Sequence, residues 1–306
     1  MKIQDHLNMA SKVTAKRLAN AARVLQSYHA SRFSGRAVIK GLPISIAIEP
    51  TTSCNLRCPE CPSGLRSFSR PTGMLNPALF NDIMGQLTES LMYLTFYFQG
   101  EPYLHKSFLP MVEYASKKGV YTATSTNGHY LKDELARNTV ESGLDRLIIS
   151  IDGLTQETYQ SYRVGGSLKT VLDGTKEVLA WKKKLKSKTP HVIFQFLVLR
   201  SNEHQIPEVY ALADSLGVDQ VVLKTAQVYD YQHGSDLIPT LDKYSRYKRK
   251  EDGTYAIKTN LINQCWKMWH SCVITWDGKV VPCCFDKDAH YSLGDVSKNS
   301  FSEIWN

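Results

Sequence analysis

Residues 52–62 read Thr-Ser-Cys-Asn-Leu-Arg-Cys-Pro-Glu-Cys-Pro and contain three of the seven cysteines of this 306-residue chain. Three residues separate Cys54 from Cys58, and two separate Cys58 from Cys61. A loop this short brings three thiols to one point, and thiolates are the ligands that hold iron–sulfur clusters. A four-iron cluster normally takes four thiolates, so three protein ligands leave one iron free to bind another molecule. The proline after Cys58 and the one after Cys61 stiffen the backbone there.

Other interpretations of the cysteine loop stay open at this point. A structural zinc site usually needs four ligands in paired spacing, and residues 52–62 contain no histidine and no fourth cysteine. A disulfide would need an oxidising compartment, and the N-terminal residues lack the apolar segment of a signal peptide. Chance is the third alternative, since short motifs give false positives. We favour the iron–sulfur site.

The composition is typical of a globular cytoplasmic protein. Hydrophobic residues make up 42% of the chain and charged residues 22%, and no apolar run approaches a membrane span. Seven cysteines without an export signal indicate the reducing cytoplasm and metal binding. The formal charge is +8, but no stacking aromatics interleave with the basic residues, which argues against nucleic-acid binding. A basic surface still suits an acidic substrate or partner.

From residue 42 onward, short β-rich runs alternate with helical patterns. We predict strands at 43–48, 93–98, 120–124, 146–151, 192–199 and 220–224, and helices at 77–90, 107–118, 132–142, 168–184 and 206–216. This alternation predicts an α/β fold with a parallel sheet and right-handed crossovers. Six such units predict a partial (β/α)6 TIM-type barrel, open on one side. We expect it to span residues 42–240, between an N-terminal helical segment (1–41) and a small C-terminal β-hairpin domain that binds a cluster (241–306).

The N-terminal segment predicts one amphipathic helix over residues 5–31, where apolar side chains recur among Lys, Arg and Gln. We favour a helix that packs on the open end of the barrel. The alternative is a basic helix that lies on a membrane surface, which would make the protein peripheral to the membrane.

Polar residues follow the predicted strands at their carboxyl ends, where β/α barrels build their active sites. Gln-Gly-Glu-Pro at 99–102 follows the second strand, Asn127 the third, and Ser150 and Asp152 the fourth. Each of these stretches is also a common turn sequence, so none is specific by itself. The position of segment 99–102, after the second strand and about forty residues beyond the cysteine loop, makes it informative.

The loop Cys54-x-x-x-Cys58-x-x-Cys61 resembles the signature of the radical S-adenosylmethionine (radical SAM) enzymes. The resemblance implies that these cysteines hold a 4Fe-4S cluster and that the amino and carboxylate groups of SAM chelate its fourth iron. Glu60 stands where the family usually has an aromatic residue, whose backbone commonly meets the adenine. The resemblance also implies a partial barrel and a flavodoxin- or ferredoxin-type electron donor.

The same resemblance implies roles for the residues at the strand ends. Segment 99–102 is similar to the family's Gly-Gly-Glu-Pro segment, which contacts the SAM amino group, and Asn127, Ser150 and Asp152 match positions that meet the SAM ribose or the substrate. Arg163 resembles an arginine that pairs with the SAM carboxylate; a surface charge at a helix end is its alternative. The implied cofactor-binding residues are Glu60, Gly100, Glu101, Pro102, Asn127, Ser150 and Arg163, and Asp152 is the implied catalytic residue.

The C-terminal fifth contains the other cysteines: Cys265, Cys272, Cys283 and Cys284. Within residues 272–283, an Asp-Gly turn between two short apolar runs predicts a β-hairpin, and cysteines that flank a hairpin can converge on one metal. The segment resembles the auxiliary-cluster domains called SPASM or twitch. A full SPASM domain has seven cysteines and two clusters. Four cysteines therefore imply the shorter twitch type with one auxiliary 4Fe-4S cluster.

The fourth ligand of this auxiliary site stays open. Cys283 and Cys284 are neighbours, and adjacent side chains in a strand point apart. They share a cluster only if the backbone bends, for which Pro282 is well placed. Otherwise Asp286, His270 or a substrate atom completes the site. A structural zinc ion is the alternative for the whole region.

These expectations describe an enzyme that reductively cleaves SAM to a 5′-deoxyadenosyl radical and abstracts hydrogen from a substrate. The auxiliary cluster would accept an electron from the substrate or anchor it. The substrate is open between a peptide, a sugar or cyclitol, and a lipid or cell-envelope precursor. Two other functions stay open: an iron–sulfur electron carrier or SAM-binding protein without turnover, and a zinc-binding interaction module.

Overall fold

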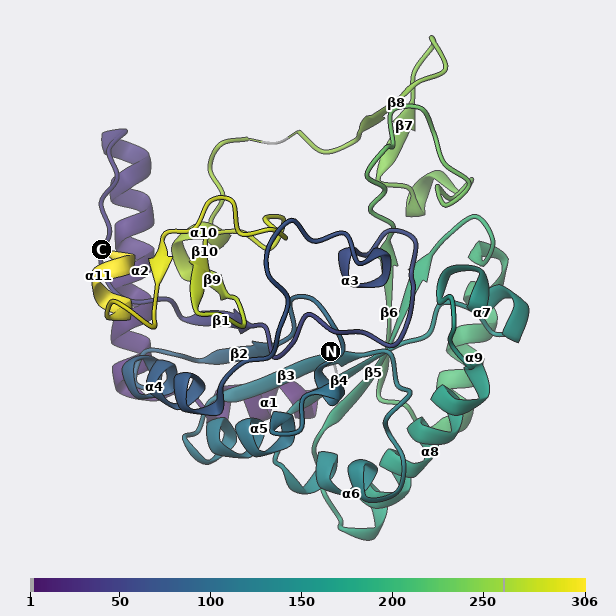
Figure 1. Cartoon of the computed structure of the whole chain (residues 1–306), viewed down its shortest axis with the longest axis horizontal. Helices are drawn as coiled ribbons and strands as arrows, with labels where there is room; N and C mark the ends of the chain where they lie inside the picture. The colour runs from purple at the N-terminus through teal and green to yellow at the C-terminus, as the bar shows by residue number, and fades with distance from the viewer. Residues whose placement is uncertain (1–2, 261) are drawn as a thin grey trace.

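A computed structural model describes residues 3–260 and 262–306 of the chain. Its centre is a nine-stranded sheet in the order β11-β10-β9-β1-β2-β3-β4-β5-β6 (Figure 1). Neighbours from β1 to β6 pair in parallel, so the α/β partial barrel is confirmed. These strands are β1 Ser45–Ile48, β2 Tyr93–Phe96, β3 Tyr121–Thr126, β4 Arg146–Ser150, β5 His191–Val198 and β6 Gln220–Thr225. All six lie where the sequence predicts them.

Helices follow the strands and cover the outer face of the curved sheet (Figure 1). Five of them were predicted: α4 Pro77–Leu87, α5 Phe108–Lys117, α6 Asp133–Glu141, α8 Leu168–Lys184 and α9 Ile206–Leu216. Two short helices near the strand ends were not predicted: α3 Pro62–Leu65 and α7 Gln156–Tyr162. Both have few turns, so the helical period of apolar residues is too short to recognise in the sequence.

The hydrophobic core lies between the sheet and these helices. Residues alternate along β1 and β2, and Ile46, Ile48 and Phe96 are buried on the helix side. Phe96 packs against Phe80 of α4, with ring centroids 5.6 Å apart. Each such side chain contributes about 1.5–3 kcal/mol when it is fully buried. The core therefore holds the strands in register and fixes the loops that leave their carboxyl ends.

The N-terminal segment forms two helices, α1 Ile3–Ser11 and α2 Ala15–Ser34, instead of the single helix expected. The chain breaks between them because Thr14 caps α2: its hydroxyl accepts a hydrogen bond from the Arg17 N–H (3.3 Å). Helix α1 lies at the amino ends of the strands, where buried Asp5 pairs with Arg146 of β4 (2.5 Å). It therefore covers the end of the barrel opposite the cysteine loop.

The C-terminal hairpin is confirmed and is joined to the barrel sheet. Strands β9 Ser271–Ile274 and β10 Lys279–Val281 are antiparallel around an Asp277-Gly278 turn, and β9 pairs in parallel with β1. A separate two-stranded sheet, β7 Tyr247–Arg249 and β8 Tyr255–Ile257, lies to one side (Figure 1). The remaining elements are α10 Lys267–His270, β11 Gly294–Asp295 and α11 Phe301–Trp305.

Candidate cluster and cofactor site

The three cysteines of the loop after β1 line one cavity of about 90 Å³ at the carboxyl ends of the strands. Cys58 is buried, and Cys54 and Cys61 are half-buried. The loops after the next strands supply the rest of the wall. Among its lining residues are five that the sequence predicted: Gly100, Glu101, Asn127, Ser150 and Arg163.

Gly100 allows the loop after β2 to lie directly against the cysteine loop. Its φ is +73°, and a Cβ placed there would lie only 2.2 Å from the Thr51 carbonyl oxygen. The Gly100 N–H donates to the Ser63 hydroxyl of α3, and the Glu101 N–H donates to the Ser53 carbonyl, each at 2.8 Å. Glycine is thus required twice, for the left-handed conformation and for the close approach.

Two of the three sulfur atoms of this loop, those of Cys54 and Cys58, face N–H donors. The Leu56 N–H donates to Cys54 Sγ (3.4 Å), Asn127 Nδ2 lies 3.9 Å from the same sulfur, and Arg163 Nη1 lies 3.8 Å from Cys58 Sγ. Burial raises the pKa of the Cys54 thiol to about 11. A buried thiolate therefore needs a cation to balance it, and iron supplies that charge. Three thiols with N–H donors around one cavity fit an iron–sulfur cluster.

Glu101 is a buried carboxylate whose two oxygens both accept hydrogen bonds. The Thr126 hydroxyl and the Asn127 N–H each donate to it at 2.7 Å. Burial raises its pKa to about 7, although these donors act in the opposite direction. The side chain has no cationic partner at hydrogen-bond distance among the described residues, so an ammonium group in the cavity would complete its surroundings.

Arg163 and Asp152 form a buried ion pair beside the cysteines. Asp152 follows β4 and Arg163 follows α7, and Arg163 Nε donates to Asp152 Oδ2 at 2.5 Å. Asp152 Oδ1 accepts from the Leu197 N–H of β5 at 2.7 Å. Burial opposes the charged guanidinium, but Asp152 and Cys58 outweigh it and raise the pKa of Arg163. Asp152 therefore fixes Arg163 with its charge beside Cys58.

Three residues named from the sequence lie outside the lining of this cavity: Glu60, Pro102 and Asp152, the last of which reaches it only through Arg163. Glu60 instead accepts a hydrogen bond from the Tyr229 N–H at 3.0 Å, and Pro102 begins a short 3-10 helix, Pro102–Leu104. The wall also contains residues that the sequence analysis did not name, such as Ser63, Tyr97 and Gln195. Positions in predicted strands were the only signal for Tyr97 and Gln195, and nothing in the sequence pointed to Ser63, which lies in the unpredicted helix α3.

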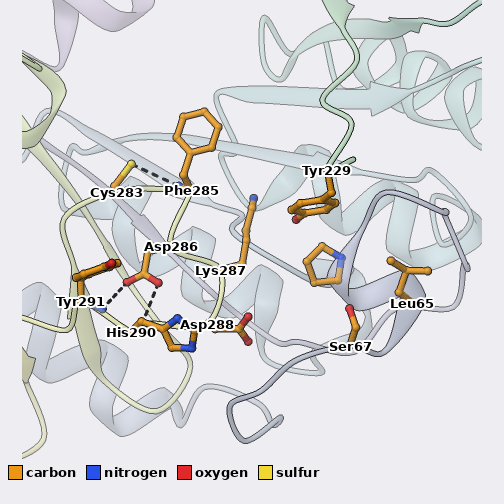
Figure 2. Close-up of a pocket in the computed structure, with 11 residues that line it drawn as sticks. Leu65, Ser67, Tyr229, Cys283, Phe285, Asp286, Lys287, Asp288, His290 and Tyr291 are labelled. Atoms are coloured by element: carbon orange, nitrogen blue, oxygen red, sulfur yellow. Dashed lines mark hydrogen bonds between the residues drawn. The ribbon is translucent and has the colours of Figure 1, made fainter. Parts of the chain in front are cut away.

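The C-terminal cysteines are divided between different surroundings. Cys272 is buried in β9 and lines a second cavity of about 370 Å³ together with Cys284. Cys283 lines a third cavity of about 550 Å³ (Figure 2). Cys265 is exposed and lines neither. Cys283 and Cys284 lie after the end of β10, outside any strand, and line different cavities.

The third cavity lies between the segment after Cys283 and helix α3 of the cysteine loop (Figure 2). Lys287 extends across it, between Phe285 on one side and Tyr229 on the other. Asp286, a suggested fourth ligand, accepts hydrogen bonds from the N–H groups of His290 and Tyr291 at 2.9 Å. Its carboxylate thus shapes the turn at 286–291.

His270, the other suggested ligand, lies with Nδ1 3.4 Å from the Ser45 hydroxyl. Within residues 3–260 and 262–306, no group of three His, Cys, Asp or Glu side chains is arranged to hold a single metal ion.

Three residues connect the three cavities, and one of them, Phe98, lines both the cysteine-loop cavity and the second cavity. Tyr97, at the end of β2, lines both the cysteine-loop cavity and the second cavity, and Lys287 lines the second and the third. The barrel mouth and the cavities of the C-terminal cysteines therefore adjoin one another. A molecule bound in the third cavity would lie against α3, directly after Cys61.

Comparison with known proteins agrees with this geometry. Residues 48–213 match the sequence model of the radical SAM superfamily, and residues 265–306 match the SPASM iron-sulfur cluster-binding domain. The chain is 28% identical over 289 residues to a tungsten-containing aldehyde ferredoxin oxidoreductase cofactor-modifying protein of Pyrococcus furiosus (84% of this chain, 79% of the relative). It is 24% identical over 282 residues to the PqqA peptide cyclase of Gluconobacter oxydans (86% and 76%).

Solved structures share the fold. Streptococcus suis SuiB bound to its precursor peptide SuiA superposes with a TM-score of 0.68 at 12% identity, covering 94% of this chain and 69% of SuiB. The anSMEcpe protein with bound AdoMet superposes with a TM-score of 0.63 at 16% identity, covering 87% and 78%. The two domain matches assign a 4Fe-4S cluster and SAM to the barrel and auxiliary iron–sulfur binding to the C-terminal segment. The barrel match spans more than half of the chain, and the protein belongs to the radical SAM superfamily.

Proposed function

We propose that this protein is an oxidoreductase or maturase that cleaves SAM reductively at the barrel mouth and modifies a peptide. When bound, the cluster and SAM together supply a 5′-deoxyadenosyl radical that removes a hydrogen atom from the substrate. One observation carries the proposal: Cys54, Cys58, Cys61, Glu101 and Arg163 line a single cavity. Thiols for iron, a carboxylate for an ammonium and a guanidinium for a carboxylate match the functional groups of the two cofactors.

Each residue of the cavity takes a role from its chemistry. The three cysteines hold the cluster, Glu101 receives the SAM ammonium, and Arg163 receives the SAM carboxylate. Asp152 acts as a positioning residue, because both of its oxygens are already engaged by Arg163 and the Leu197 N–H. Its contact with the ribose or the substrate stays a prediction.

The remaining predicted cofactor contacts differ in whether their side chains line this cavity. Asn127 and Ser150 are buried at the ends of β3 and β4 and line it, which suits hydrogen bonds to the ribose. The predicted contacts of Glu60 and Pro102 would run through their backbone, because neither side chain lines the cavity.

Three points favour a peptide over a sugar, a cyclitol or an envelope precursor. A PqqA peptide cyclase is among the relatives, and SuiB bound to a precursor peptide is among the proteins of the same fold. The third cavity, at about 550 Å³, is also larger than the first two, and exposed Phe285, Tyr229 and Tyr291 line it. Aromatic walls around an open cavity suit the side chains of an extended chain.

We propose that the C-terminal cysteines hold one auxiliary 4Fe-4S cluster beside this cavity. Cys272 and Cys284 line one cavity, and Cys283, the neighbour of Cys284, lines the adjoining one. A flavodoxin- or ferredoxin-type protein is the proposed electron donor.

The proposed residue boundaries of the barrel are 42 and 240. None of the described helices is long and apolar enough to span a membrane.

The test uses anaerobically reconstituted protein with dithionite and SAM. We expect 5′-deoxyadenosine to form, and its yield to rise with the correct substrate. Candidate peptides encoded near this gene, free sugars and lipid-linked precursors are compared in deuterated form. Deuterium transfer from a peptide into 5′-deoxyadenosine supports the proposal. Transfer from a sugar or lipid only would refute the peptide, and absence of SAM cleavage would refute the activity.

A further inference from the structure

Helix α2 packs on the rest of the protein through polar side chains. Asn20 exchanges two hydrogen bonds with the backbone of Leu42, at 2.8 and 2.9 Å. Further along the same face, the buried hydroxyls of Ser27 and Ser31 bond the backbone of residues 38–40. These side chains satisfy backbone groups of an extended segment that has no strand partner. The face of α2 that is turned to the protein is therefore unusually hydrophilic.

The opposite face of α2 is exposed and mostly apolar, with exposed His29 as a polar residue between Leu25 and Phe33. Leu18 is 57% exposed, Leu25 48% and Phe33 90%, and exposed Ala22 lies between the first two. Their spacing at i, i+4, i+7 and i+15 places them in one row along the helix. We call Leu18, Ala22, Leu25 and Phe33 the outer row. Helix α2 stands at the edge of the molecule, with the barrel and the hairpin on one side of it (Figure 1).

Basic residues occur along α2 and in the segment that follows it, and acidic residues are missing from this part of the sequence. Between Asp5 and Glu49 there is no Asp or Glu, whereas Lys and Arg occur seven times. Three of the seven are engaged: Arg17 is buried, Lys12 pairs with Asp145, and Lys16 pairs with Glu89. The exposed basic residues with no ion pair in the described part of the chain are Arg23, Arg32, Arg36 and Lys40.

We propose that the outer row, with Arg23 and Arg32 on α2 and Arg36 just beyond its end, forms a docking surface for an anionic lipid bilayer. Leucine and phenylalanine enter the boundary between headgroups and acyl chains, while the arginines contact lipid phosphates. This places a radical SAM enzyme at a membrane surface, attached through the outer row of α2. The inference does not depend on the substrate or on SAM cleavage.

The charge pattern selects lipid over a second copy of the chain. Two copies of α2 facing each other through the outer row would bring Arg23 and Arg32 of both chains together with no carboxylate on either helix to balance them. An anionic bilayer supplies that balance along the whole row. Helix α2 spans twenty residues, so it can lie along the surface over its full length.

The experiment is co-sedimentation of the full chain with vesicles of phosphatidylcholine, with and without equimolar phosphatidylglycerol. We expect binding to the anionic vesicles that weakens as salt is added, and little binding to phosphatidylcholine alone. Leu18→Ser, Leu25→Ser and Phe33→Ser together should weaken binding by more than about tenfold, because they remove the apolar insertion. Arg23→Gln, Arg32→Gln and Arg36→Gln together should also weaken it by about tenfold or more.

A matched control replaces Leu135, Leu185 and Tyr210, which are exposed on barrel helices or at their ends, by serine. This variant should bind like the wild type. Thermal melting and 5′-deoxyadenosine formation should be unchanged in all three variants, which separates failed docking from failed folding. If the triple serine variant of the outer row bound anionic vesicles as strongly as the wild type, the proposal would be overturned. It would also be overturned by a wild-type dimer that ignores vesicles and becomes monomeric when the outer row is replaced.

Discussion

The two groups of cysteines in this protein differ in how far the polypeptide arranges them before any cluster is present. Cys54, Cys58 and Cys61 line one cavity, whereas Cys265 is exposed and Cys283 and Cys284 line different cavities. The first group lies within eight residues of one loop, and the second spans twenty. The lesson is that a short loop can preform a metal site, while dispersed ligands must be gathered by the metal itself.

Hydrogen bonds explain why the first loop is preformed. The loop after β2 donates to Ser53 and Ser63 on either side of the cysteines, each at 2.8 Å. In the second group, Cys272 is held within β9, and Cys283 follows β10 in a turn shaped by Asp286. We therefore expect cluster binding to stabilise the C-terminal segment more than the barrel loop.

The largest expected effect is the loss of the barrel cluster. Changing Cys54, Cys58 and Cys61 together to Ala should abolish 5′-deoxyadenosine formation, because the thiolates that hold the cluster are gone. Iron analysis of the reconstituted variant should fall from about two clusters to about one. The variant's melting temperature is the control for folding. Retained SAM cleavage in this variant would contradict the site.

The matching change in the other group should separate the two functions. Changing Cys265, Cys272 and Cys283 to Ala should remove the auxiliary iron and spare SAM cleavage, because the SAM cavity is built by barrel loops. Product formation should fail. We also expect protease sensitivity within residues 265–306 to rise, since the cluster gathers this segment. Zinc in place of iron in the wild-type segment would point to a structural metal.

A glycine substitution tests how the first loop is preformed. Gly100→Ala puts a Cβ 2.2 Å from the Thr51 carbonyl oxygen at a φ of +73°, so the two loops must separate. We expect SAM cleavage to fall by about tenfold or more, the effect of a misplacement of about 1 Å in an active site. Gly85→Ala in α4 is the control, because its Cβ meets nothing within 4 Å. It should stabilise the protein by about 0.5–1 kcal/mol in thermal unfolding.

Asp152→Asn tests the ion pair beside Cys58. The change keeps the shape of the side chain and removes the charge that orients Arg163, which is worth about 1.5–3 kcal/mol for a charged hydrogen bond. We expect SAM binding, measured by calorimetry, to weaken by about tenfold or more. Iron content should stay at the wild-type level, since Asp152 touches no cysteine in the contacts described. An unchanged affinity for SAM would refute the positioning role of Asp152.

The smallest effect is the pH dependence of SAM binding through Glu101. Burial raises its pKa to about 7, so the carboxylate that would receive the SAM ammonium becomes protonated as the pH falls through 7. SAM affinity should therefore drop by several-fold between about pH 8 and 6.5. Between its ordinary pKa and 7 the folded apoprotein holds more protons than the unfolded chain, so its stability should fall as the pH rises. Glu101→Gln should flatten both profiles.

Local patterns in the sequence were enough for the elements of the barrel. The apolar runs of β1 to β6 and the periodicity of α8 and α9 lie within single segments, so each could be recognised without its partners. The prediction of one N-terminal helix was less accurate. The break at Thr14 depends on a side-chain cap of α2, and a threonine at that position looks like any other polar residue in the sequence. Helices α3 and α7 were too short to leave a pattern.

The sequence by itself determined the cluster-binding loop, because Cys54, Cys58 and Cys61 are close along the chain and their spacing survives any fold. Only the tertiary structure decided the pairing of Arg163 with Asp152, the joining of β9 to β1, and the division of Cys283 and Cys284 between two cavities. These features depend on contacts between segments far apart in the sequence or on the course of the turn that follows β10. Such contacts are set by packing of the whole core, which no local spacing of residues encodes.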